Sequence, residues 1–187
     1  MNAIRQFDRD AKLLLFRECF TGRQDVYGTY DPATHRSWQV KETVTDRVFL
    51  DHLIGRKPYG VYLLTGDRTR AIVADFDKDD LAAPMDFVAV AAHYGLAAYI
   101  ERSKRKGYHV WTFFGSNGVS ARRARLVFRH MRDEVGAGTI EVFPKQDVLA
   151  PDSSYFGNFV NVPLFGRLVP KGRTVFLNTA GPVTPYP

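Results

Sequence analysis

The chain has 187 residues, of which 45% are hydrophobic, and this is enough to build the core of one sizeable domain. Its formal net charge of +6 suits a polyanionic partner, although the same surplus spread over a surface would serve solubility alone. A single cysteine, Cys19, excludes an internal disulfide framework and a cysteine-rich zinc site. Because there is neither a secretory leader nor an apolar run of about eighteen residues, we expect a cytoplasmic protein without membrane insertion.

The N-terminal part, residues 1–57, is interpreted as an accessory lobe. Apolar residues at helical spacing in FDRDAKLLLFRECFTG, residues 7–22, predict a first helix that Gly22 ends. Residues 23–57 are polar and irregular, and within them TDRVFLDHLIG, residues 45–55, predicts one short helix.

Residues 58–187 are interpreted as the core and a C-terminal extension. The runs YGVYLLTGD and RTRAIVADFD flank a turn at residues 65–67 and predict a hairpin. A helix at 83–95, strands at 96–103 and 107–114, a helix at 121–136 and a strand at 138–144 follow. The order from Arg70 to Pro144 is β-α-β-β-α-β, so the predicted class is α+β with an RRM-like (ferredoxin-like) core. The tail, rich in Pro, Gly and Asn, stops abruptly, as if cut from a longer protein.

Two aspartates one residue apart end the apolar run IVADFDKDD, residues 72–80. Residues two apart in a strand face the same side, so Asp75 and Asp77 are expected to project together, about 7 Å apart along the strand. Paired carboxylates suit a hard divalent cation with oxygen ligands. The alternative is that both acids only solvate the end of a strand, and the D-x-D pattern alone favours that reading.

Topology adds two further residues to this pair. In the usual ferredoxin-like arrangement the spatial strand order is 4-1-3-2, so the end of the first strand lies beside the beginnings of the third and fourth. Those beginnings carry His109 in GYHVW and Glu141 in TIEVF. We expect these residues to meet on the face that the helices leave uncovered, where a cation would relieve the repulsion among the acids.

A basic turn, SKRKGYH at residues 103–109, is predicted beside these acids. Its hydroxyl, cations and backbone N–H groups suit a triphosphate, while a solvated hairpin turn is the plain alternative. The helix at 121–136 is expected to expose its arginines, either as a solvated face or as a track for template phosphates. They are Arg122, Arg123, Arg125, Arg129 and Arg132.

The segments VADFD, SKRKGYHVW and IEVFPKQ, in this order, resemble the three motifs of archaeo-eukaryotic primases and primase-polymerases. FTGRQDVYG, DHLIGRKPYGVYLL and FGNFVNVPLFG extend the resemblance to the branch found in TOTE conflict systems and among CRISPR-associated primase-polymerases. The resemblance runs from Phe20 to the tail and implies one catalytic domain over residues 1–187, with the RRM-like core of that family.

Residue by residue, the resemblance implies a metal site, a nucleotide site and nucleic-acid contacts. Asp75, Asp77 and Glu141 match the acids that hold two Mg²⁺ or Mn²⁺ ions. The nucleotide-binding positions are Ser103, Lys104, Arg105, His109, Lys145 and Asn158. Arg23 is the candidate nucleic-acid contact that the resemblance adds to Arg122 and Arg123. Residues 30–47 lack the cysteine cluster that relatives carry, so zinc is not implied.

The expected activity is template-dependent nucleotidyl transfer from nucleoside triphosphates, which makes or extends a primer on a DNA template. RNA as the template, the choice of ribo- or deoxynucleotides and primer initiation are left open. Helicase, nuclease or CRISPR adaptation proteins are the expected fused or associated partners. Two other functions remain open: a metal-dependent nuclease and a non-catalytic RRM-like nucleic-acid binder.

Overall fold

The computed structural model describes residues 2–150, 154–179 and 184–185, with side chains from residue 10 onward within these ranges. The helices are α1 (Asn2–Cys19), α2 (Asp46–Leu53), α3 (Ala82–His93), α4 (Ala121–Glu134) and the short η1 (Val169–Lys171). The central sheet contains, in spatial order, β10 (Glu141–Phe143), β6 (Ala71–Phe76), β8 (Tyr108–Phe113), β7 (Tyr99–Arg102), β12 (Val175–Asn178) and β13 (Thr184–Pro185). A second sheet contains β11 (Val160–Asn161), β3 (Gly60–Val61), β1 (Tyr27–Tyr30) and β2 (Ser37–Val40).

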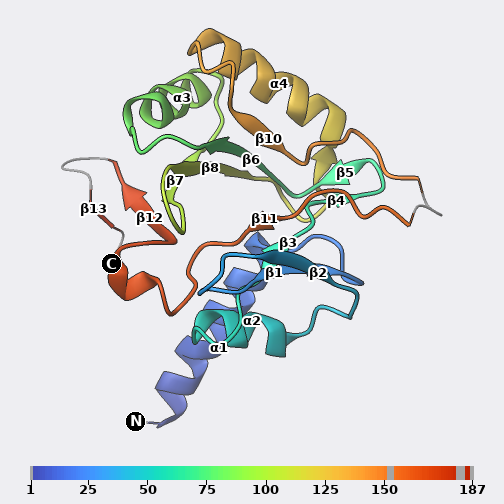
Figure 1. The fold of residues 1–187 in the computed structure, drawn as a ribbon, viewed down its shortest axis with the longest axis vertical. Coiled ribbons are helices and arrows are strands. Elements are labelled where there is room, and N and C mark those ends of the chain that lie inside the picture. Colours follow the sequence, from blue (N-terminus) through green and yellow to red (C-terminus); the bar gives the residue numbers. More distant parts are fainter. Residues whose placement is uncertain (1, 151–153, 180–183, 186–187) are drawn as a thin grey trace.

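The central sheet has the strand order that the β-α-β-β-α-β pattern predicts. The fourth strand of that unit, β10, pairs with the first, β6, which pairs with the third, β8, and then the second, β7. All of these pairs are antiparallel. The tail adds β12 beside β7, an extension that the β-α-β-β-α-β unit does not include. Both α3 and α4 cover one face of this sheet (Figure 1).

Side chains alternate along β6 between two apolar cores. Ile72, Ala74 and Phe76 pack under α3 and α4. Ala71 and Val73 point the other way, into a core shared with the N-terminal lobe. Asp75 is in phase with Val73 and therefore lies on the lobe side, away from the helices, as predicted. That face is not open, however, because α1, α2 and the second sheet lie against it (Figure 1).

Two expectations for the first 77 residues were wrong in detail. Residues 23–57 are not irregular throughout, since β1 and β2 form a hairpin there. The two long runs around residues 65–67 do not pair along their length. Only β4 (Leu64–Thr65) and β5 (Arg68–Thr69) form the hairpin, which β9 (Val119–Ser120) extends to three strands. The earlier part of the first run, β3, joins the second sheet instead, so the run passes from one sheet to the other.

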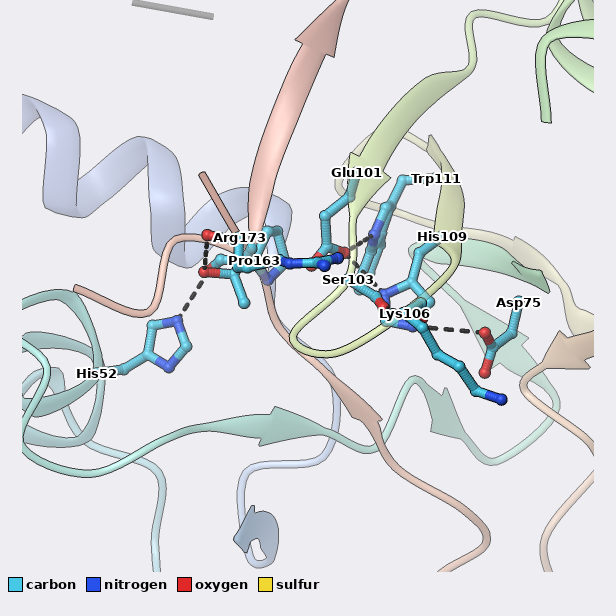
Figure 2. Close-up of polar contacts among 10 residues, drawn as sticks. His52, Asp75, Glu101, Ser103, Lys106, His109, Trp111, Pro163 and Arg173 are labelled. Atoms are coloured by element: carbon cyan, nitrogen blue, oxygen red, sulfur yellow. Dashed lines mark hydrogen bonds and ion pairs between the residues drawn. The ribbon is translucent and has the colours of Figure 1, made fainter. Parts of the chain in front are cut away.

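A buried histidine ties the lobe to the tail. His52 on α2 is 1% exposed; the backbone N–H of Tyr59 donates to its Nδ1, so its Nε2 carries the proton and donates to the carbonyl oxygen of Pro163 at 2.8 Å (Figure 2). Burial lowers the pKa of His52 to about 4, and the ring is therefore neutral at physiological pH. Among the described residues, no helix is long and apolar enough to cross a membrane.

Candidate active site

One cross-strand row brings the predicted residues together. Glu141 on β10 lies opposite Asp75 on β6, and Asp75 lies opposite His109 on β8. The row continues to Glu101 on β7, which lies opposite His109. Residues directly opposite each other in an antiparallel pair have Cβ atoms about 5 Å apart. The predicted meeting of Asp75, His109 and Glu141 is thus confirmed, and Glu101 is an addition.

Asp75 is the partly buried acid at the centre of this row. Its Oδ1 lies 3.6 Å from His109 Nε2 (Figure 2). Burial raises the pKa of Asp75; the charge of His109 opposes this, while Asp77, Glu141 and Glu101 raise the pKa further. The neighbouring acids therefore repel the charge on Asp75, which is the condition that a bound cation would relieve.

Asp77 differs from the sequence expectation in its local structure. β6 ends at Phe76, so Asp77 stands one residue beyond the strand and is not held by strand alternation. It is exposed and lines a pocket of about 270 Å³ with residues that start α3 and follow α4. Its charge still raises the pKa of Asp75, which places the two carboxylates within electrostatic reach of each other.

His109 is held by a buried carboxylate. Its Nδ1 lies 2.8 Å from Glu101 Oε2, and Trp111 Nε1 donates to the same oxygen at 2.7 Å (Figure 2). Glu101 and His109 are 1% and 7% exposed. Burial by itself lowers the pKa of His109, but the charges of Glu101 and Asp75 outweigh burial, and the pKa is raised.

The basic turn at residues 103–107 is closed by its own hydrogen bonds. Ser103 Oγ donates to the carbonyl oxygen of Lys106 at 2.6 Å, and the backbone N–H of Ser103 donates to the carbonyl of Gly107. The hydroxyl of Ser103 therefore donates its proton within the turn and not to a ligand. Gly107 has a φ of +78°, and a Cβ there would lie 1.9 Å from the carbonyl oxygen of Phe76. The turn is therefore pressed against the end of β6.

Lys104 links this turn to the N-terminal lobe. Its Nζ lies 3.8 Å from the ring centroid of Tyr30 on β1, a cation–π contact. Burial, followed by the charge of Arg105, lowers the pKa of Lys104 to about 8, although Asp75 acts in the opposite direction. Arg105 itself is exposed. The turn thus presents one partly buried and one exposed cation near Asp75.

Two further predicted residues follow β10. Lys145 Nζ donates to Glu141 Oε1 at 2.6 Å, so the predicted third acid is paired with a predicted nucleotide contact. Gln146 Nε2 donates to Asn158 Oδ1 at 2.9 Å, which joins the segment after β10 to the segment before β11. Lys145 is therefore held directly at Glu141, and Asn158 is joined to the segment after β10 through Gln146.

The arginines of α4 divide into exposed ones and ones that pair with an acid; Arg132 is half-buried and pairs with its neighbour Asp133. Arg122, Arg123 and Arg129 are exposed and form no ion pair with another residue in the described ranges. Arg125 was expected to be exposed, but it is 6% exposed and pairs with Asp147. The helical turn directs it inward, beside Ala121, Ala124 and Phe128. A groove of about 250 Å³ runs beside Glu141 and is lined by Arg125, Arg129, Arg132, Ile140, Glu141, Val142 and Lys145.

Arg23 is held by two neighbouring side chains. Its guanidinium pairs with Asp25 through two hydrogen bonds, at 2.9 and 2.6 Å. It also lies over the ring of Phe156, 4.9 Å from the centroid. Arg23 is therefore fixed against the segment that carries Asn158, but it is not in the cross-strand row.

The described residues contain no preassembled cluster of three or more His, Cys, Asp or Glu side chains at metal-binding geometry. Asp75, Asp77 and Glu141 are nevertheless the donor set that Mg²⁺ and Mn²⁺ prefer, and their charges act on one another. The donor types therefore suit a hard divalent cation, while Glu141 is paired with Lys145 in this structure.

The fold and the row together define an α+β protein with acids and a histidine at one end of an antiparallel sheet. A family model described as the archaeo-eukaryotic primase domain of the TOTE conflict system matches residues 11–186. The chain belongs to this family, which is a family of primase-polymerases.

A solved structure, the polymerase domain from Mycobacterium tuberculosis ligase D in complex with DNA, aligns with 13% sequence identity and a TM-score of 0.49. The alignment covers 68% of this chain and 59% of that one. No curated protein matches the sequence.

Proposed function

We propose that this chain is a template-dependent nucleotidyltransferase that joins nucleoside triphosphates to a primer strand on DNA. The observation that carries the proposal is the row Glu141, Asp75 and His109 beside the basic turn, in a chain of the archaeo-eukaryotic primase family. In this proposal residues 58–187 form an RRM-like catalytic core and extension, and residues 1–57 form a lobe against its catalytic face.

Asp75, Asp77 and Glu141 would hold two divalent cations, Mg²⁺ or Mn²⁺. When bound in such a site, two cations supply positive charge to the attacking and leaving oxygens of an in-line displacement. Asp75 would contribute from the centre of the row, and Glu141 from the neighbouring strand. Lys145, which now pairs with Glu141, would be released toward a phosphate when the acid takes up a cation.

The nucleotide would lie between the row and the basic turn. His109 Nε2 and Lys104 Nζ would face its phosphates, since both act electrostatically on or near Asp75. Arg105 would contact the outer phosphates from its exposed position, and Asn158 would contact the sugar or base. For Ser103 we propose a role in shaping the turn, because its proton already goes to Lys106.

The nucleic-acid strands would follow the basic surface of α4. Arg122, Arg123 and Arg129 are exposed, and the groove that Arg129 lines runs beside Glu141. Unpaired arginines along a helix suit phosphate contacts that do not read sequence. Arg23 would make a further contact from the lobe, next to Phe156.

Primer extension tests the proposal. Purified protein, Mn²⁺, a primed DNA template and labelled nucleotides should give a product whose sequence follows the template. A nuclease would shorten the DNA without nucleotides, and a non-catalytic binder would do neither. The row places carboxylates where RRM-like binders carry aromatic residues, which favours an enzyme over a binder. Folded protein that extends no primer under any combination of metal and template would refute the proposal.

A further inference from the structure

Glu101 is a buried acid to which the sequence patterns give no role. It lies on β7 directly opposite His109 and is 1% exposed. Removing a carboxylate from water costs several kcal/mol unless it is well paired. Glu101 is well paired: His109 and Trp111, two residues apart on β8, both reach its Oε2 (Figure 2).

The indole partner determines which ring nitrogen of His109 carries the proton. An indole N–H can only donate, so Glu101 Oε2 is an acceptor in its bond to Trp111. The same oxygen lies 2.8 Å from His109 Nδ1. An ionised carboxylate has no proton to donate, so Glu101 Oε2 accepts this hydrogen bond as well. His109 therefore holds a proton on Nδ1, and its Nε2 is the nitrogen directed at Asp75, 3.6 Å from Oδ1.

We propose that Glu101 is a positioning residue that fixes the orientation and the Nδ1–H form of His109. It thereby holds the ring with Nε2 directed to the carboxylate row, where Nε2–H of the doubly protonated ring would donate to a phosphate of a bound nucleotide. The ring form follows from the hydrogen bonds alone. The kinetic consequence rests on the proposed function, so the two are tested by separate measurements.

The ring form is tested by ¹⁵N chemical shifts of the histidines, recorded without nucleotide at alkaline pH, where the rings are neutral. The His109 signals, identified by their loss in His109→Ala, should report an Nδ1–H ring in the wild-type protein. In Glu101→Leu the acceptor is gone, and the Nε2–H form should dominate because Asp75 Oδ1 is then the nearest acceptor. Glu101→Gln retains a carbonyl acceptor and should keep Nδ1–H. An Nε2–H ring in the wild-type protein would overturn the inference.

The kinetic consequence is tested by primer extension with the same variants. Glu101→Leu should lower kcat about 10- to 100-fold, with a smaller change in KM, as expected for an outer partner of a working histidine. Glu101→Gln should restore part of the loss. In the double variant with His109→Ala, the Glu101→Leu change should lower kcat no further, because Glu101 acts through His109. If the kcat losses of Glu101→Leu and His109→Ala multiply in the double variant, Glu101 does not act through His109.

A matched control separates positioning from loss of stability. Thr112 on β8 is 2% exposed and donates to the carbonyl oxygen of Ala97 at 3.0 Å. Thr112→Val removes another buried hydrogen bond of the same strand while it leaves His109 untouched. It should lower the thermal midpoint but keep kcat and the His109 shifts. If the wild-type protein extends no primer, the proposed function fails, whereas the ¹⁵N shifts still decide the inference.

Discussion

Glu141 and Asp75 lie directly opposite each other on β10 and β6, so two carboxylates from distant parts of the chain meet at one end of the sheet. Each of them has a cationic neighbour. His109 Nε2 lies 3.6 Å from Asp75, and Lys145 Nζ lies 2.6 Å from Glu141. The site thus contains acids partly balanced by residues that could also contact phosphates.

Asp75 is expected to reduce stability in the absence of metal. Its pKa is raised, chiefly by burial, so the folded state holds the carboxyl proton more tightly than the unfolded state. Ionised Asp75 therefore lowers the free energy of unfolding above its folded pKa. Asp75→Asn should raise the thermal midpoint at neutral pH in EDTA, and in a separate assay with Mn²⁺ it should lower primer extension more than about 100-fold.

The pH dependence of this gain has a definite sign. The advantage of Asp75→Asn should shrink as the pH falls through the raised folded pKa toward the unfolded value of 3.8, since both states then bind the proton. Thermal melts of both proteins across this range measure it. A gain that grows on acidification would contradict the assigned environment of Asp75.

Gly107 should tolerate alanine much less well than Gly95. Both have positive φ, at +78° and +71°, so alanine is strained at either position. Only at Gly107 does the added Cβ meet backbone, the carbonyl oxygen of Phe76; at Gly95 nothing lies within 4 Å. Gly95→Ala should cost about 1 kcal/mol and Gly107→Ala about 2 kcal/mol more, from strain and displacement of the turn. Urea unfolding measures both, and equal costs would refute this close approach.

Lys104 should make nucleotide binding sensitive to alkaline pH. Its pKa is lowered to about 8, chiefly by burial. Above that pH the free enzyme loses a cation that we propose to face the phosphates, so KM for the nucleotide should rise. Lys104→Met should have a raised KM at neutral pH and lack this pH-dependent rise. If wild type and variant show the same pH profile, Lys104 does not contact the phosphates.

Lys104 should also make the free energy of unfolding depend on pH, because its pKa is lowered in the folded state. A lowered lysine pKa means that the unfolded state binds the proton more tightly between about 8 and the ordinary value of 10.5. Stability should therefore rise with pH through this window, by an amount that Lys104→Met removes. Denaturation at fixed salt across the window measures this difference.

The α4 arginines should set the salt dependence of DNA binding. Arg122→Ala with Arg123→Ala should lower the slope of log K against log salt by about two, and Arg129→Ala should lower it by about one. Arg47→Ala is the control, because Arg47 lies on α2 and pairs with Asp51. Fluorescence anisotropy with one DNA at several salt concentrations measures the slopes. Unchanged slopes in all the α4 variants would exclude α4 as the DNA-binding surface.

The sequence predicted the central sheet well because its strands and helices carry clear periodicity and turn residues. Alternation along residues 71–76 placed Asp75 on the face away from the helices, and topology then placed His109 and Glu141 beside it. The hairpin of β1 and β2 was missed because β2 is mostly exposed and polar and lacks strict apolar alternation. The sequence predicted that the run containing β3 would pair with the run after the turn at residues 65–67. In the structure β3 pairs with β1 and β11 instead, because tertiary packing, which local patterns do not specify, decides this pairing.

The role of Glu101 was also missed, although a signal exists. Glu101 and Ser103 alternate at the end of one strand, and His109 and Trp111 alternate at the start of the next, so all four face the same side across the turn. Because Glu101 faces the same side as Trp111, a residue expected in the core, its carboxylate could be predicted to be buried and paired with a neighbour on that face. The prediction that Arg125 is exposed was wrong. Five arginines are spread along α4, and Arg125 is the one on the buried face of the helix.

We propose that Asp75, Asp77 and Glu141 hold divalent cations together with a nucleoside triphosphate. Mn²⁺ binding followed by electron paramagnetic resonance, with and without a nucleoside triphosphate, tests it most directly. We predict that Mn²⁺ binds the protein, that the triphosphate tightens this binding, and that Asp75→Asn abolishes the tightening while the protein remains folded. Equal triphosphate-dependent Mn²⁺ binding by the wild-type protein and Asp75→Asn would contradict the claim.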